Sequence, residues 1–131
     1  MPADTNRKVV LRSYPKGAPG ADNFEIVEEA IPAPGPGEVL VRAIYLTVDP
    51  YMRGRLRPGP SYAEPQKIGA VMVGEIAGQV LESNAQGFAK GDYVTADTGW
   101  QTHGVADRRD LRKAIANALA MLLRQPADAV V

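Results

Sequence analysis

EVLVRAIYL, the nine residues 38–46, is the stretch that decides the fold class of this chain. Apolar side chains occupy both faces of the stretch when it is extended, which is typical of a strand covered on two sides or built into a barrel. The preceding segment, residues 32–37, reads PAPGPG, and its three prolines fix φ and lack N–H donors. Asp49-Pro50 follows and ends the extended stretch. We therefore expect a β-strand from residue 38 to residue 46.

Short apolar runs separated by glycine and proline continue on both sides of this strand. The chain contains 13 Gly and 11 Pro, which favours a β-rich fold with many turns. Gly74 and Gly78 interrupt one of these runs, and glycine inside a strand indicates a bulge, a bend or a close backbone approach. The further strands that we expect are residues 9–12, 24–29, 71–81 and 93–96, with loops at 14–23 and 54–65.

The end of the sequence has a different character. Between residues 114 and 124, apolar side chains fall at the spacing of an amphipathic helix, and Gln125-Pro126 stops it. Residues 129–131 are expected to form a short strand.

The composition limits the kind of protein. A chain of 131 residues with 45% hydrophobic and 23% charged residues is expected to form one globular domain, with or without an appendage. Basic and acidic residues number 15 each, so no net charge favours nucleic acid or an anionic membrane. The polar start is not a signal peptide, and no run of about 18 apolar residues could span a membrane. We therefore expect a cytoplasmic enzyme or binding module.

Metal chemistry has few ligands available in this sequence. There is no cysteine, which excludes disulfides and thiolate metal sites, and there is one histidine, His103. Without a second imidazole or a nearby serine, His103 can complete neither a zinc site nor a catalytic triad. We expect His103 to have a structural role.

Tyr51 is the first candidate for chemistry. It follows Asp49-Pro50 directly after the strongest predicted strand, so its phenol is presented on a defined turn. A phenol in this position can donate a hydrogen bond to a carbonyl oxygen and stabilise the enolate that forms when hydride reaches a conjugated β-carbon. The alternative is that Tyr51 packs its ring and bonds to backbone.

Five other side chains are candidates for a binding site. Arg53, Arg55 and Arg57 could anchor a carboxylate or phosphate, although a solvated loop is the commoner setting for such arginines. Tyr62 lies in a Pro/Gly-rich loop of the kind that often lines a pocket. Trp100 is expected to fill core in preference to lining a pocket. No G-x-G-x-x-G opens a helix, because Gly35-Pro36-Gly37 leads into a strand, so no nucleotide site is visible.

Three blocks of sequence, taken in order, resemble the medium-chain dehydrogenase/reductase superfamily. They are P-x-P-x-P-G-E-V-L-V at 32–41, L-T-V-D-P-Y-M-R-G at 46–54, and G-D-Y-V at 91–94 with G-W-Q at 99–101. The second block is similar to the zinc-free branch that contains leukotriene B4 12-hydroxydehydrogenase, prostaglandin reductase and the alkenal and curcumin reductases. Zinc-binding members carry Cys in the region of Thr47–Asp49 and Gly-His-Glu where this chain has Gly69-Ala70-Val71.

The resemblance implies a mainly β fold, a GroES-like partly open β-barrel over residues 1–113. Residues 114–131 would supply a C-terminal helix and short strand that either complete the barrel or form an unrelated tail. It also implies NADPH as cofactor and a small-molecule enone or enal as partner, with no nucleic acid and no membrane. The resemblance also implies that Tyr51 is the catalytic residue that contacts the substrate carbonyl, and that Tyr51, Arg53 and Tyr62 line the substrate site.

The length of the chain departs from this family. Full-length members are more than twice as long, and their cofactor sits mainly on a Rossmann domain that is absent from this sequence. We expect the 131-residue chain alone to be inactive or nearly so. The short length could result from a truncation, from an internal deletion or from a natural short form. The oligomeric state is also open, with a homodimer as one alternative. The alternative function is a stand-alone GroES-like binding or oligomerisation module without catalysis.

Overall fold

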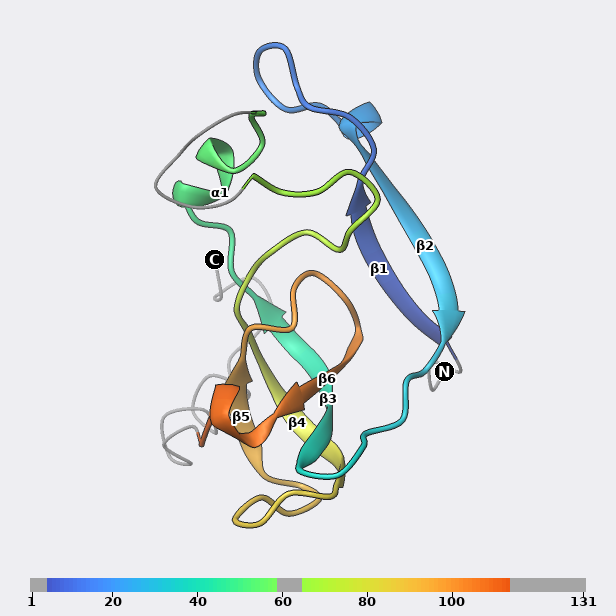
Figure 1. Ribbon diagram of the computed structural model, residues 1–131, viewed down its shortest axis with the longest axis vertical. Helices are drawn as coiled ribbons and strands as arrows, with labels where there is room; N and C mark the ends of the chain where they lie inside the picture. The colour runs from blue at the N-terminus through green and yellow to red at the C-terminus, as the bar shows by residue number, and fades with distance from the viewer. Residues whose placement is uncertain (1–4, 59–64, 114–131) are drawn as a thin grey trace, which may run out of the picture.

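The computed structural model describes residues 5–58 and 65–113, which form two antiparallel sheets and very little helix (Figure 1). The smaller sheet pairs β1 (Thr5–Leu11) with β2 (Phe24–Ala30). The larger sheet curls into a half-barrel with the strand order β6-β3-β4-β5-β7. Its strands are β3 (Glu38–Leu46), β4 (Ile76–Ser83), β5 (Tyr93–Ala96), β6 (His103–Asp107) and β7 (Leu111–Lys113). The mainly β fold expected from the sequence is confirmed.

The helical elements are short. One α-helical turn, α1 (Tyr51–Gly54), follows β3, and two 3-10 turns, η1 (Ala21–Asn23) and η2 (Arg108–Asp110), precede β2 and β7. The predicted turn at Asp49-Pro50 is therefore the start of α1, because the Asp49 carbonyl accepts from the Met52 N–H at 3.1 Å. The expected helix at 114–124 and strand at 129–131 lie outside the described residues, as does Tyr62.

β3 is an interior strand of the larger sheet and has the bounds that the sequence predicts. It pairs with β4 along one edge and with β6 along the other. Val39 and Val41 are no more than 1% exposed, as expected for a strand covered on its inner face. The core beneath this sheet contains Val39, Val41, Ile76, Val80, Ala85, Val94, Ala96, Ala106 and Leu111.

The predicted strand at 71–81 is wrong in its first part. β4 begins only at Ile76, because the preceding residues bond elsewhere. The Met72 N–H donates to the Val9 carbonyl at 2.8 Å, and the Met72 carbonyl accepts from the Trp100 N–H at 2.9 Å. This segment therefore links β1 to the chain between β5 and β6. The short strands β6 and β7 were not predicted.

A buried asparagine ties β1 to the larger sheet. Asn6 is 1% exposed, and its side-chain amide donates to Gln101 Oε1 at 2.8 Å. Its Oδ1 accepts from the backbone N–H of His103 at 2.9 Å and from the Thr102 hydroxyl at 3.3 Å. These bonds satisfy a buried polar group and join segments more than 90 positions apart in the sequence.

Gly78 allows β3 and β4 to approach closely where their register shifts. The shift falls between Ala43 and Tyr45, opposite Gly78 and Ala77. A Cβ at Gly78 would collide with the backbone carbonyl of Arg42 and lie 2.8 Å from Val41 Cγ1. Because the obstacle is backbone, no side-chain rotation relieves it.

The substitution Gly78→Ala is therefore expected to lower the free energy of unfolding by about 1–3 kcal/mol, the cost of an overpacked site. Urea denaturation of the 131-residue chain measures the effect. Gly17→Ala is the matched control, since no heavy atom lies within 4 Å of a Cβ built there. Equal urea midpoints for the two variants would contradict the close approach.

Candidate active site

α1 presents two polar side chains on one side and buries two apolar side chains on another. Met52 and Leu56 are 4% and 3% exposed and pack with Leu11 and Met72. Residue 55 keeps a helical conformation, with φ −82° and ψ −6°, so the turn continues to Arg55. Tyr51 and Arg55 are thus four residues apart on a helical turn, the spacing at which side chains share a face.

Tyr51 and Arg55 line one cavity of about 340 Å³. Asp97 and Thr98, which follow β5 directly, also line it. Tyr51 is 40% exposed, so its ring is accessible from solvent. The remaining lining residues are Val71, Val73, Gly74 and Gly99. The cavity therefore combines a phenol, a guanidinium, a carboxylate and a hydroxyl with apolar walls.

The surroundings of Tyr51 keep its phenol protonated. Burial raises the pKa of Tyr51 above its usual value, and the carboxylates of Asp49, Asp97 and Glu75 raise it further. The guanidinium of Arg55 opposes this by lowering the pKa. The net shift is upward, so Tyr51 is a hydrogen-bond donor throughout the neutral and mildly alkaline range.

Arg53, which we expected beside Tyr51, lies elsewhere. Two residues along a helix from Tyr51, it faces nearly the opposite direction. Its Nη2 donates to the carbonyl of Gly17 at 2.9 Å, and within the described part of the chain its Nη1 is buried with no hydrogen-bond partner. Arg53 does not line the cavity with Tyr51, and Arg55 takes that place. The four-residue spacing from Tyr51 was the signal that distinguishes the two arginines.

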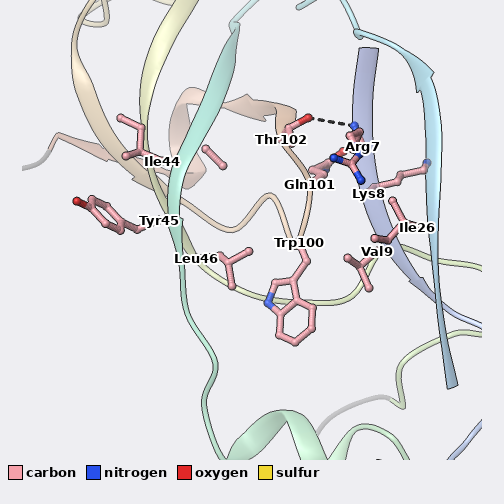
Figure 2. A pocket seen from close by; sticks show the side chains of 11 residues that line it. Arg7, Lys8, Val9, Ile26, Ile44, Tyr45, Leu46, Trp100, Gln101 and Thr102 are labelled. Atoms are coloured by element: carbon pink, nitrogen blue, oxygen red, sulfur yellow. Dashed lines mark hydrogen bonds between the residues drawn. The ribbon is translucent and has the colours of Figure 1, made fainter. Parts of the chain in front are cut away.

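A second cavity, of about 320 Å³, lies between β3 and the β1–β2 pair (Figure 2). Val9, Ile26, Leu46 and Trp100 give it a largely apolar lining, and the ring of Tyr45 points away from Trp100. Its basic residues are Arg7 and Lys8, which pair with Glu28 and Glu29 at 3.5 Å and 2.9 Å. Among the described residues that line it there is no Asp or Glu, whereas the Tyr51 cavity contains both a phenol and a carboxylate.

Trp100 both fills core and lines a cavity. Its ring packs against the cluster of Leu11, Met52 and Met72 and lies 6.4 Å from the Phe24 ring. Its indole Nε1 donates to the Thr47 carbonyl at 3.0 Å, which satisfies the donor in a partly buried setting. The expectation that Trp100 fills core is therefore correct, and its edge on the apolar cavity is additional.

His103 is buried, as expected for a residue with a structural role. It is 3% exposed, and its Nδ1 lies 2.9 Å from the Thr102 hydroxyl. Burial and then the charge of Arg42 lower the pKa of His103, so the ring is neutral at pH 7. Over residues 5–58 and 65–113, no cluster of three or more His, Asp or Glu side chains is arranged to hold a metal ion. Over the same ranges, no helix has the length and hydropathy to cross a membrane.

Comparison with known proteins gives one family. Residues 7–114 match the family described as the N-terminal domain of oxidoreductase. The chain is 46% identical over 108 residues to the NADPH-dependent curcumin reductase of Escherichia coli (strain K12), covering 82% of this chain and 31% of that protein. It is 38% identical over 106 residues to prostaglandin reductase 1 of Sus scrofa, covering 81% of this chain and 30% of that protein.

A solved structure agrees with this fold. CurA from Vibrio vulnificus matches with a TM-score of 0.81 and 48% identity, over 85% of this chain and 32% of that one. CurA from the same organism in complex with NADPH matches with a TM-score of 0.74 and 50% identity, over 77% and 30% of the two chains. The chain thus spans about a third of the length of the relatives that it matches.

The charge environment of Tyr51 makes a prediction about its titration. Replacing Asp97 with Asn removes a carboxylate that raises the pKa, so the pKa of Tyr51 should fall while remaining that of a protonated phenol at neutral pH. Ultraviolet absorbance against pH measures the phenolate, and subtraction of a Tyr51→Phe titration isolates this residue from the other four tyrosines. An unchanged or raised pKa in Asp97→Asn would show that Asp97 does not act on the phenol.

Proposed function

This chain belongs to the family of the N-terminal domain of oxidoreductase, and from that premise we propose that residues 1–113 form the substrate-side domain of an NADPH-dependent, zinc-independent reductase. The reaction is reduction of the C=C bond of an α,β-unsaturated ketone or aldehyde. The observation that carries this proposal is a phenol held in its protonated form in the wall of a cavity of about 340 Å³. The names of the relatives, which include curcumin, prostaglandin and 2-alkenal reductases, support the same substrate class.

The chemistry asked of Tyr51 is donation of a hydrogen bond. Hydride adds to the β-carbon, the π electrons of the C=C bond move toward the carbonyl, and negative charge collects on the carbonyl oxygen. A donor aimed at this oxygen binds it more tightly as the charge grows, which lowers the barrier. The α-carbon then takes a proton from solvent water, and the C=C bond is saturated. The raised pKa of Tyr51 keeps the donor in place during the reaction.

The reduced nicotinamide supplies the hydride when it is bound. Over residues 5–58 and 65–113 the single α-helix opens on Pro50 and has no glycine-rich turn for a pyrophosphate. The cavity of about 340 Å³ has the size of a site for a small enone. We therefore propose that the dinucleotide is held mainly by a second domain outside residues 1–113. The cytoplasmic location stays a prediction.

Domain replacement tests this function. Residues 7–114 of this chain would replace the matching segment of the Escherichia coli curcumin reductase, which is 46% identical over 108 residues. The rest of that reductase stays unchanged. We expect the chimera to oxidise NADPH only when an enone is present and to yield a product heavier by two hydrogens. The absorbance of NADPH measures its oxidation, and mass spectrometry measures the mass of the product. A chimera that folds and binds NADPH but reduces no enone would overturn the proposal.

In the same chimera, Tyr51→Phe is expected to lower kcat by about 10²–10³-fold, as loss of one donor to a developing oxyanion does. The free energy of unfolding should change little, because Tyr51 is 40% exposed. Tyr93→Phe is the control, since Tyr93 lies on β5 and lines neither cavity described above. Normal turnover with a large loss of stability in Tyr51→Phe would support the packing role for this residue instead.

A further inference from the structure

We propose that Arg55 is a second catalytic residue of the Tyr51 cavity, whose guanidinium shares with the Tyr51 hydroxyl the negative charge that forms on the substrate carbonyl oxygen. The inference rests on the proposed function, since it concerns the same oxygen. Without Arg55, the Tyr51 hydroxyl would have to stabilise the enolate alone, next to three carboxylates that disfavour a negative charge.

The position of Arg55 is fixed by the residues around it. Met52 and Leu56 anchor one face of the turn in the core. The Arg55 N–H donates to the Met52 carbonyl at 3.2 Å, and the Arg55 carbonyl accepts from the Gln66 N–H at 2.7 Å. With its backbone held on both sides, Arg55 projects into the cavity wall beside Tyr51. A donor placed in advance in this way costs little reorganisation when charge develops.

The charges around Tyr51 explain why a cation is needed. Four charged side chains act on the phenol, and three of them are the carboxylates of Asp49, Asp97 and Glu75. These carboxylates keep the phenol protonated, but they also disfavour a new negative charge on a carbonyl oxygen beside it. Arg55 is the cation of the four. Its field therefore opposes the carboxylates where the enolate oxygen must form.

The guanidinium suits this task chemically. It stays charged throughout the working pH range and offers five N–H donors in a planar fork. Contact with Asp97 or another group would leave further donors for the substrate oxygen. In the step proposed, Arg55 neither gains nor loses a proton. The hydride and its electron pair go to the β-carbon, and the negative charge on oxygen is held by two hydrogen-bond donors until the α-carbon is protonated.

Kinetics of the chimera test the catalytic role. Arg55→Gln keeps a polar side chain but removes the charge, and kcat should fall by about 10²-fold with a smaller change in KM. Arg55→Lys should recover part of kcat, because it restores the charge without the fork. Arg12→Gln is the control, because Arg12 is exposed and lines neither cavity, and its kcat should stay near that of the parent chimera. Equal kcat values for Arg55→Gln and Arg12→Gln would overturn the inference.

Two measurements on the 131-residue chain do not depend on turnover. The pKa of Tyr51 should rise in Arg55→Gln, because the cation that lowers it is gone. The affinity for 4-nitrophenolate, a probe with a negatively charged oxygen on a conjugated ring, should fall in Arg55→Gln and persist in Arg12→Gln. If Arg55→Gln does not fold, Arg55→Lys gives the same comparison with the fork removed.

These outcomes separate the two proposals. A chimera that reduces enones with full kcat in Arg55→Gln, and binds 4-nitrophenolate unchanged, overturns the role of Arg55 and leaves the proposed function standing. A folded, NADPH-binding chimera that reduces no enone overturns the proposed function, and the catalytic role of Arg55 falls with it.

Discussion

β3 is hydrogen-bonded along both edges between Val39 and Arg42, and this double pairing fixes it inside the larger sheet, between β6 and β4. Beyond Arg42 the strand keeps β4 as its partner, while β6 has ended, and the register shift opposite Gly78 bends the pair. The strand then ends with the Thr47 N–H bonded to the Glu75 carbonyl at 3.0 Å. Because α1 begins four residues later, the pairing of β3 sets where Tyr51 lies.

The Tyr51 cavity reflects a conflict between two electrostatic requirements. A phenol must keep its proton to donate a hydrogen bond, and burial beside Asp49, Asp97 and Glu75 raises its pKa accordingly. The same carboxylates would penalise the oxyanion that the donor is meant to stabilise. A guanidinium in the cavity wall reduces the penalty while leaving the phenol protonated, since its effect on the pKa is smaller than the combined effect of burial and carboxylates. The arrangement of charges is thus consistent with one donor and one cation acting together.

Sequence patterns predicted the elements whose signal is local. β3 and β5 have the expected bounds because their apolar runs are closed by turn residues. The run at 71–81 was misread because an apolar pattern does not reveal which partner a backbone bonds, and half of it bonds to β1 and the Trp100 segment. The same limit applies to the site. Tyr51 was visible from its turn, whereas choosing between Arg53 and Arg55 required the helical phase of α1, and Asp97 joins them only through tertiary packing.

The indole of Trp100 supports the segment that leads to Tyr51. Its N–H bonds the Thr47 carbonyl, two residues before Asp49, so it holds the chain at the entry to α1. Gly74 makes room for this ring, because a Cβ there would lie 2.8 Å from the indole nitrogen. Gly74 also lines the Tyr51 cavity. Its missing side chain therefore makes room both for the Trp100 ring and for the cavity. The position of the phenol therefore depends on a glycine and a tryptophan that take no part in the proposed chemistry, as supporting residues around a preorganised site do.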